Sequence, residues 1–257
     1  MTERSAQSFR IDGCAALVTG ASAGLGAAMA VALAEAGADV AAHGNTRSPA
    51  GACARIEATG RKAVALTGDL ADRSVAGRLV DETVRALGRL DILVNNAGLI
   101  RRAPAEQYSD EDWDRVIEVD LTSAFRLARS AGQHMIASGR GGRIVNIASL
   151  LAFQGGITVP AYAAAKGGLA QLTKALANEW ASKGINVNAV APGYIETDVT
   201  TALRNDPVRS RQLLERIPAG RWGQPEDVAG VVVFLASPAS RYVHGHVLAV
   251  DGGWLGR

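Results

Sequence analysis

The sequence predicts a doubly wound α/β domain, in which helices cover both faces of a parallel sheet. Short apolar runs alternate along the chain with longer stretches whose Ala, Leu and Val residues recur at helical spacing. Most of these runs are continuous rather than alternating, as expected of parallel strands that are buried on both faces. Strand–helix alternation with right-handed crossovers then gives the doubly wound arrangement.

The elements follow from this alternation in chain order. The expected strands are the apolar runs at 14–19, 39–43, 62–67, 91–95, 143–148, 185–191 and 246–250. The expected helices include 24–37, 73–87, 110–138 and 160–183. The segment 193–224 interrupts the pattern with Pro207, Pro218 and Gly220, and lies where a lid over a ligand crevice would be expected. We therefore expect one domain over residues 1–257, with 193–224 as its mobile part.

Composition narrows the class of protein. The chain has 257 residues, with 27 Lys and Arg against 25 Asp and Glu, so its net charge of +2 argues against a nucleic-acid partner. The longest apolar stretch, near Val228 to Ala236, is too short to cross a bilayer, and the polar N-terminus is no signal peptide. Cys14 and Cys53 form no CxxC pair and suit a reducing compartment. We expect a soluble, cytoplasmic protein that is not bound to membranes.

A glycine-rich turn follows the first expected strand and runs into a helix. It reads TGASAGLG over residues 19–26. Glycines allow a tight turn and a close approach to a pyrophosphate, whose charge is met by the N–H groups of a helix N-terminus. The spacing differs from the GxGxxG fingerprint, so a dinucleotide site needs support from other residues.

The same turn also contains a possible nucleophile elbow. Gly20, Ser22 and Gly24 match the GxSxG pattern of serine hydrolases, which likewise lies between a strand and a helix. Such an elbow needs earlier strands, and only about a dozen residues precede this one. We keep a hydrolase acting through Ser22 as a remote alternative.

A tyrosine and a lysine lie one helical turn apart at the start of the stretch 160–183. Tyr162 and Lys166 share one helix face, where the ammonium would favour the phenolate form of the tyrosine. Such a tyrosine can give or take a proton at a hydroxyl or carbonyl oxygen. Ser149 ends the strand 143–148 and could hydrogen-bond the same oxygen. Singly, these residues could equally be a surface pair and a cap.

Taken together, these motifs resemble those of the short-chain dehydrogenase/reductase family. They are TGASAGLG (19–26), NNAG (95–98), Ser149 with Tyr162 and Lys166, and PGYIET (192–197). The resemblance extends from about residue 10 to VDGG at 250–253. It implies a seven-stranded parallel sheet of Rossmann type, a nicotinamide dinucleotide cofactor, Tyr162 as catalytic acid/base, Lys166 as its partner and Ser149 on the substrate carbonyl.

The resemblance also assigns residues to the cofactor. The pyrophosphate turn would consist of Gly20, Ser22, Gly24, Leu25 and Gly26. The adenosine half would meet Asp69, Leu70, Asn96, Ala97 and Gly98. The nicotinamide half would meet Tyr162, Lys166, Pro192, Gly193, Ile195 and Thr197.

Two positions depart from the family pattern. Asp120 stands where the family usually has an asparagine that positions a water beside the lysine. Its charge would partly cancel the field of Lys166, so we expect oxidation to peak at more alkaline pH. The alternative is that aspartate is merely tolerated here as an isostere of asparagine.

The second departure lies at the end of the second strand, where Gly44 replaces the acid that NAD-preferring members often carry. Asn45 and Arg47 follow, and Arg47 could pair with a 2′-phosphate, which favours NADP slightly while NAD stays open.

Within the family, the chain is most similar to the sugar-acid dehydrogenases. The similarity is found in the segments NNAGLIRR (95–102), FQGGITVPAY (153–162), NEWA (178–181), RIPAGRWG (216–223) and VDGGWLGR (250–257). The implied substrates are 2-deoxy-D-gluconate, 2-dehydro-3-deoxy-D-gluconate or gluconate. A carboxylate substrate calls for a cationic anchor. The candidate substrate residues are Arg101, Arg102, Gln154, Arg221 and Trp222.

Other functions stay open beside this one. A different alcohol or a 3-oxoacyl group could be the substrate, and a non-catalytic dinucleotide-binding regulator would share the fold. His244 and His246 alternate on a strand, but no carboxylate stands at metal-ligand spacing, so we expect no metal site. The resemblance favours a homotetramer.

Overall fold

The computed structural model describes residues 7–257 and contains one parallel sheet of seven strands in the order β3-β2-β1-β4-β5-β6-β7. This confirms the predicted fold. The strands are β1 (Ala15–Val18), β2 (Asp39–Gly44), β3 (Ala63–Thr67), β4 (Ile92–Asn95), β5 (Gly142–Ile147), β6 (Ile185–Pro192) and β7 (Val247–Val250). Each lies within a residue or two of the apolar run that predicted it.

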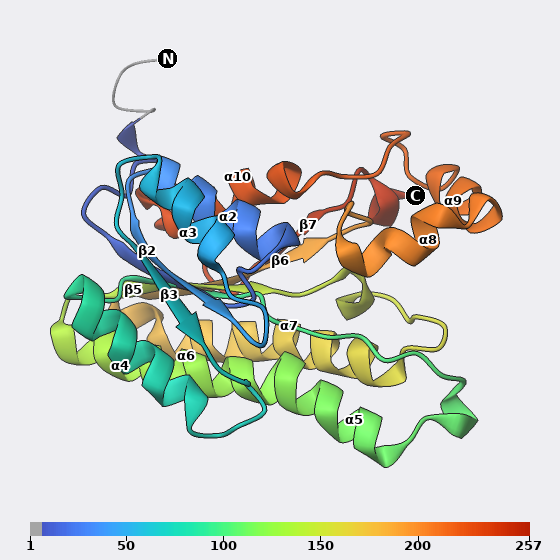
Figure 1. Cartoon of the computed structure of the whole chain (residues 1–257), viewed down its shortest axis with the longest axis horizontal. Helices are drawn as coiled ribbons and strands as arrows, with labels where there is room; N and C mark the ends of the chain where they lie inside the picture. The colour runs from blue at the N-terminus through green and yellow to red at the C-terminus, as the bar shows by residue number, and fades with distance from the viewer. Residues whose placement is uncertain (1–6) are drawn as a thin grey trace.

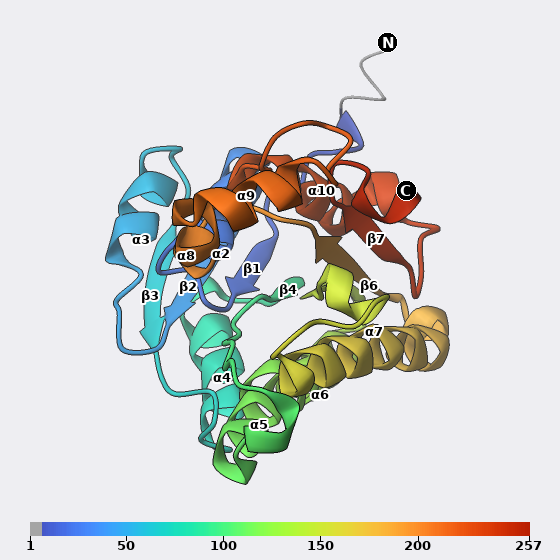
Figure 2. The same cartoon turned by 90° about the vertical axis from the view of Figure 1, so that its right-hand side faces the viewer.

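Helices cover both faces of the sheet (Figures 1 and 2). One face carries α2 (Gly24–Glu35), α3 (Ala50–Glu57) and α10 (Pro225–Ala236). The other carries α4 (Val75–Leu87), α5 (Asp110–Ile117), α6 (Ser123–Ser138) and α7 (Pro160–Trp180). Short helical turns complete the chain: η1 (Ala105–Gln107), η3 (Leu150–Ala152), η4 (Ala181–Lys183), η6 (Pro238–Ser240) and η7 (Trp254–Gly256). None of the helices within residues 7–257 is both long and apolar enough to cross a membrane.

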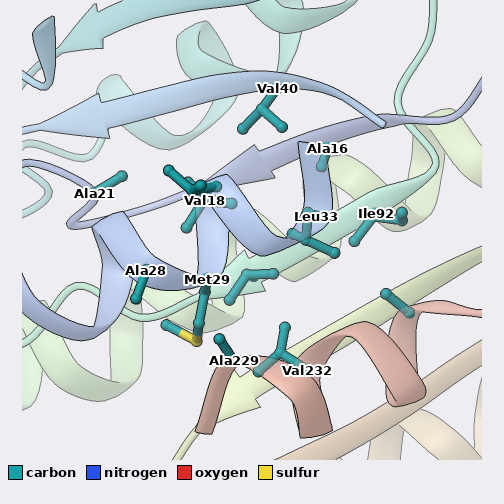
Figure 3. Packing of buried hydrophobic residues seen from close by; sticks show 14 of the residues in the cluster. Ala16, Val18, Ala21, Ala28, Met29, Leu33, Val40, Ile92, Ala229 and Val232 are labelled. Carbon is teal, nitrogen blue, oxygen red and sulfur yellow. The ribbon is translucent and has the colours of Figure 1, made fainter. Parts of the chain in front are cut away.

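The core on the first face joins two helices to the strands beneath them (Figure 3). Met29 and Leu33 of α2 are fully buried, together with Val18 of β1, Ile92 of β4 and Val232 of α10. Burying a side chain of this size contributes roughly 1.5–3 kcal/mol. The long apolar stretch near the C-terminus therefore forms a core helix.

The two edge strands are less buried than the inner ones. All residues of β6 are buried, whereas those of β7 are only half-buried and those of β3 are mixed. An edge strand has a partner on one side only, so part of its backbone and side chains stays open. The continuous apolar run at 246–250 predicted a strand buried on both faces, and this was wrong for β7 because it lies at the edge of the sheet.

The strand order reverses between β1 and β4, which are neighbours in the sheet. In sheets of this kind, ligands bind outside the carboxyl ends of the strands at such a reversal. The loops after β1 and β4 are joined there through Thr19, whose Oγ1 accepts from the backbone N–H groups of Asn96 and Ala97, both at 3.0 Å. The Asn96 side chain donates back to Thr19 O at 2.9 Å.

The stretch 110–138 was expected as one helix and contains a wide turn. Helix α5 begins after Ser109, whose side chain accepts from Asp112 N. It continues into η2 (Glu118–Thr122), a π-helical turn, and then into α6. The predicted helical stretch 110–138 thus has the correct bounds. It differs from a single α-helix by the extra residue of the π turn.

The segment 193–224 leaves the sheet and forms two short helices. It contains η5 (Asp198–Thr200), α8 (Thr201–Asn205) and α9 (Pro207–Leu214). In Figure 2 these helices extend beyond the sheet on the same side as α2. Asp206 caps α9 by accepting from Val208 N and Arg209 N.

Candidate active site

A cavity of about 690 Å³ opens where β1, β4, β5 and β6 end. The predicted residues that line it are Gly20, Gly24, Leu25, Gly26, Asn96, Ala97, Gly98, Arg102, Asp120, Ser149, Gln154, Tyr162, Lys166, Pro192, Gly193, Ile195 and Thr197. The fold thus brings most of the predicted site to one place. The cavity has the size of ligand sites that enclose small molecules.

The glycine-rich turn ends in an open helix N-terminus. Gly20 and Gly24 have positive φ, and a Cβ at Gly26 would lie 2.1 Å from Gly20 O. No side chain caps α2 at Ala23, and no acidic residue stands in its first turn. Its free N–H groups therefore suit a phosphate.

A buried histidine supports this turn from the neighbouring strand. His43 Nε2 lies 2.9 Å from Gly68 O, and the Gly20 N–H approaches His43 Nδ1 at 3.5 Å. Burial lowers the pKa of His43, which keeps the ring neutral, with a proton on Nε2 and an acceptor at Nδ1. The sequence did not single out His43, because it lies inside an apolar run.

The three predicted catalytic side chains come from two elements. Ser149 follows β5 and its Oγ accepts from Leu151 N at 3.2 Å, which leaves its hydroxyl proton free to donate. Tyr162 lies in the first turn of α7 and Lys166 one turn later. The Lys166 ammonium is buried, donates to Ile147 O at 3.0 Å and lies 5.5 Å from the Tyr162 ring centre.

Asp120 and Lys166 form a buried ion pair, with Oδ2 3.4 Å from Nζ. The π turn η2 carries Asp120, and its Oδ1 accepts from Leu99 N at 2.8 Å. Burial raises the pKa of Asp120, against the pull of the Lys166 ammonium. Burial also lowers the pKa of Lys166, but the Asp120 carboxylate and Tyr162 together more than offset this and the net shift is upward. The carboxylate thus opposes the charge of the lysine, as the sequence hypothesis requires.

A chain of buried amides aligns α7 with the sheet. Asn95 Nδ2 donates to Asn146 Oδ1 at 2.9 Å, and Asn146 Nδ2 donates to Thr173 Oγ1 at 2.9 Å. The chain runs from β4 through β5 to α7, the helix that carries Tyr162 and Lys166. Asn146 and Thr173 were not predicted as site residues; polar side chains inside apolar stretches were the available signal.

Comparison with known proteins identifies the family. A family model described as "Enoyl-(Acyl carrier protein) reductase" matches residues 20–255. The chain belongs to the short-chain dehydrogenase/reductase family. It is 50% identical over 249 residues to a 2-dehydro-3-deoxy-D-gluconate 5-dehydrogenase of Escherichia coli, covering 97% of this chain and 98% of that one. The prediction of an oxidoreductase acting on CH–OH groups is confirmed.

Two solved structures of the family are similar over nearly the whole chain. One is a putative 2-deoxy-D-gluconate 3-dehydrogenase from Agrobacterium tumefaciens with bound NADP, at 53% identity and TM-score 0.90, covering 97% of this chain and 99% of that one. The other is a gluconate 5-dehydrogenase from Burkholderia cenocepacia in complex with NADP and tartrate, at 40% identity and TM-score 0.92, covering 98% and 99%. These relatives agree with the predicted nicotinamide cofactor.

Five residues predicted for the cofactor are not among those that line this cavity: Ser22, Asn45, Arg47, Asp69 and Leu70. Asp69 accepts from Ala71 N and pairs with Arg115 at 2.8 Å, and these contacts lower its pKa. Leu70 is buried beneath it. Asn45 is exposed. Ser22 Oγ donates to Arg47 O at 2.6 Å, so the serine fixes the loop after β2, and nothing here supports the hydrolase alternative.

The structure divides the predicted substrate residues. Arg102 and Gln154 line the cavity. Arg101 instead pairs with Asp112 of α5 at 3.3 Å. Trp222 is buried against Tyr194, with ring centres 5.7 Å apart.

Arg221 is also engaged away from the cavity. It makes two hydrogen bonds to Asp227, at 2.7 and 2.9 Å, at the start of α10. This contact, with a backbone N–H from Gln224, lowers the pKa of Asp227 to about 2. Arg221 therefore connects the end of the segment 193–224 to the start of α10.

The cavity also contains residues that the sequence did not single out. Tyr194, Arg209, Arg216 and Trp254 line it beside Gln154. They come from the segment 193–224 and from the C-terminal turn η7, which only the fold brings together. His244 and His246 do not alternate on a strand as expected, because β7 begins only at Val247, and His244 Nε2 lies 3.2 Å from Asn186 Nδ2.

Proposed function

We propose that this protein is an NAD(P)-dependent dehydrogenase that interconverts a secondary alcohol and a ketone on a sugar acid. The observation that carries this proposal is the convergence of Ser149, Tyr162 and Lys166 on one cavity with the open glycine-rich turn. The proposed substrates are 2-deoxy-D-gluconate, 2-dehydro-3-deoxy-D-gluconate or gluconate, which the names of the relatives support. The tartrate named with one relative is likewise a hydroxylated carboxylate.

The residues present fit a nicotinamide dinucleotide. The uncapped N-terminus of α2 and the absence of side chains at Gly20, Gly24 and Gly26 leave room and donors for a pyrophosphate. When bound, the nicotinamide ring supplies or accepts the hydride. Pro192, Gly193, Ile195 and Thr197 would hold that half of the cofactor. The NADP bound to the relatives supports NADP as a cofactor here.

In the oxidation direction, Tyr162 would take the proton of the substrate hydroxyl at its phenolic oxygen. Ser149 would donate its free hydroxyl proton to the same substrate oxygen and so hold it in place. The Lys166 ammonium, fixed by Ile147 O, favours the phenolate form of Tyr162 by its charge. Reduction reverses these steps, with Tyr162 returning the proton to the carbonyl oxygen.

We propose that Asp120 modulates this proton transfer as a positioning residue. Its carboxylate lies against Lys166 and offsets part of the ammonium charge that acts on Tyr162. The alkaline optimum expected from the sequence follows from this pairing. Its hydrogen bond to Leu99 N also fixes the loop after β4, which carries Arg101 and Arg102.

We also propose that residues 193–224 close over the bound ligands, because Thr197, Leu203 and Leu213 of this segment line the cavity. Slower hydrogen exchange in this segment on addition of NADP would support closure, and unchanged exchange would contradict it. The resemblance to the family supports a homotetramer, which we propose on that ground. Light scattering after gel filtration tests it, and a monomer would contradict it. A cytoplasmic location completes the proposal.

The decisive experiment combines substrates, cofactors and one substitution. Reduced-nicotinamide absorbance is followed with NAD or NADP and with 2-deoxy-D-gluconate or D-gluconate, for the wild type and Tyr162→Phe. We expect turnover in the wild type and a loss of about 10²–10⁴-fold in kcat for the variant, the range typical of a lost acid/base group. Turnover that survives Tyr162→Phe would contradict the mechanism, and no turnover of either sugar acid would contradict the substrate class.

A further inference from the structure

The wall of the cavity next to Ser149 is built from an indole, an amide and a guanidinium. Trp254 is buried, and its Nε1–H donates to Gln154 Oε1 at 3.3 Å. Gln154 N in turn donates to Leu150 O at 3.2 Å, directly after Ser149. The guanidinium of Arg216 lies over the Trp254 ring, 4.0 Å from its centre. The wall therefore runs from Ser149 through Gln154 and Trp254 to Arg216.

Trp254 is held in place by its own turn and by the lid. Asp251 accepts from Gly253 N and Leu255 N, both at 2.9 Å, and so fixes η7. The Tyr194 ring lies 4.7 Å from Trp254, centre to centre. The ring is thus positioned by these contacts, and the central carbon of the Arg216 guanidinium lies over it.

Stacking leaves the edge of the guanidinium available. Arginine presents its N–H donors in a planar fork that matches a carboxylate, and an aromatic face below it does not occupy them. Within residues 7–257, no carboxylate lies within ion-pair distance of Arg216, whereas Arg101 and Arg221 are both paired. A cation that is pre-oriented in a cavity loses less freedom when it binds an anion.

We propose that Arg216, held on Trp254, binds the carboxylate of the substrate and determines the preference for sugar acids over neutral sugars. This inference rests on the proposed function. A sugar acid whose reacting oxygen lies at Ser149 and Tyr162 would extend along Gln154, whose amide N–H groups remain free for a hydroxyl. Its carboxylate would then reach Arg216. Arg102 and Arg209, which also line the cavity, are the competing anchors, and Arg102 is the one on the opposite side, after β4.

The test compares an acid with its neutral isostere. We measure kcat/KM for D-gluconate and D-gluconamide, and for 2-deoxy-D-gluconate and its amide, with saturating NADP. Arg216→Gln and Arg216→Lys are compared with Arg102→Gln and with Arg211→Gln, an exposed position on α9, the helix that ends just before Arg216. Thermal melts show whether each variant is folded.

For Arg216→Gln we expect the acid-to-amide ratio of kcat/KM to fall by about 10- to 100-fold, mainly through KM, as for a lost hydrogen bond to a charged group. Arg216→Lys should lie between this variant and the wild type, because it keeps the charge and loses the fork. Arg211→Gln should leave the ratio unchanged.

An unchanged ratio in Arg216→Gln, or the same loss for acid and amide, would overturn the inference. If the acid-to-amide ratio falls only in Arg102→Gln, the carboxylate binds at Arg102 and the inference about Arg216 is overturned. Either result with an active wild type leaves the proposed function intact. A wild type that turns over no sugar acid would overturn the proposed function and, with it, this assignment.

Discussion

The two sides of the cavity are built by different means. The part proposed to hold the cofactor pyrophosphate consists of backbone: a turn with glycines at 20, 24 and 26 and an uncapped helix end, all within one short stretch. The substrate side consists of side chains, and its central contact joins Gln154 to Trp254, which are 100 residues apart. Where backbone atoms form a site, there is no room for an added side chain. Where side chains form it, they can be replaced, and the choice of side chain sets the specificity.

The largest effect should come from adding one methyl group on the cofactor side. In Gly26→Ala the new Cβ would lie 2.1 Å from Gly20 O, so the turn must shift. We expect a penalty of about 3 kcal/mol in NADP binding or folding, near the upper range for overpacking. Fluorescence titration with NADP and thermal melts measure it.

Gly77→Ala is the matched control for this change. Gly77 lies on α4, and a Cβ there would meet no atom within 4 Å. Alanine is favoured over glycine inside a helix by about 1 kcal/mol, so this variant should be neutral or more stable. If Gly26→Ala both binds NADP and melts as the wild type does, the backbone description of the cofactor side is wrong.

A smaller effect is expected between the two sides, at the buried ion pair. In Asp120→Asn the Lys166 ammonium loses the opposing charge, so more of its positive charge acts on the reacting oxygen and the acid limb of the oxidation profile moves to lower pH. The pKa of Lys166 also falls, because the Asp120 carboxylate no longer offsets the effect of burial, so the alkaline limb moves the same way. We expect a shift of about one pH unit, the order of effect of one nearby charge.

Profiles of kcat against pH for the wild type and Asp120→Asn test this expected shift. Leu99 N can still bond to the asparagine oxygen, so the loop after β4 should keep its position. KM for the cofactor, measured alongside, should therefore change little. Superimposable profiles would mean that Asp120 acts only as a structural isostere.

The smallest effect should come from a side chain on the cofactor side. Arg47 is largely exposed and lies 3.7 Å from the exposed Asp198, a pair that contributes little. Arg47→Ala should weaken NADP about fivefold and NAD hardly at all, as expected for one exposed charge. Kinetics with both cofactors measure this, with Arg55→Ala on α3 as the control. A loss of two orders of magnitude would show that side chains dominate this side too.

The comparison also explains what the sequence could predict. The strands, the glycine-rich turn and the Tyr162–Lys166 pair are local patterns, and the structure contains all of them within a residue or two. The pair needs only the helical repeat. Asp120 was found as a departure from a family pattern, although its contact with Lys166 required the fold.

The substrate wall could not be predicted in this way. Arg101 and Arg221 lie close in sequence to residues that line the cavity, but each is paired with a carboxylate on a helix. Arg101 pairs with Asp112, and Arg221 pairs with Asp227. Arg216 was part of a quoted motif without being singled out, because its partner Trp254 stands far away in the chain. Which arginine is free depends on tertiary pairing, and no local pattern encodes that.

The π turn at Glu118–Thr122 has a consequence for chain length. A wide turn contains one more residue than an α-helical turn, and each residue rotates the helix by about 100°. Upstream of it, Val116 faces α7; downstream, Leu127 faces the sheet. Deleting one residue here would straighten the helix and turn one of these faces away from its partner. The number of residues in this helix is therefore as constrained as their identity, and an alignment gap at this position would signal a different site.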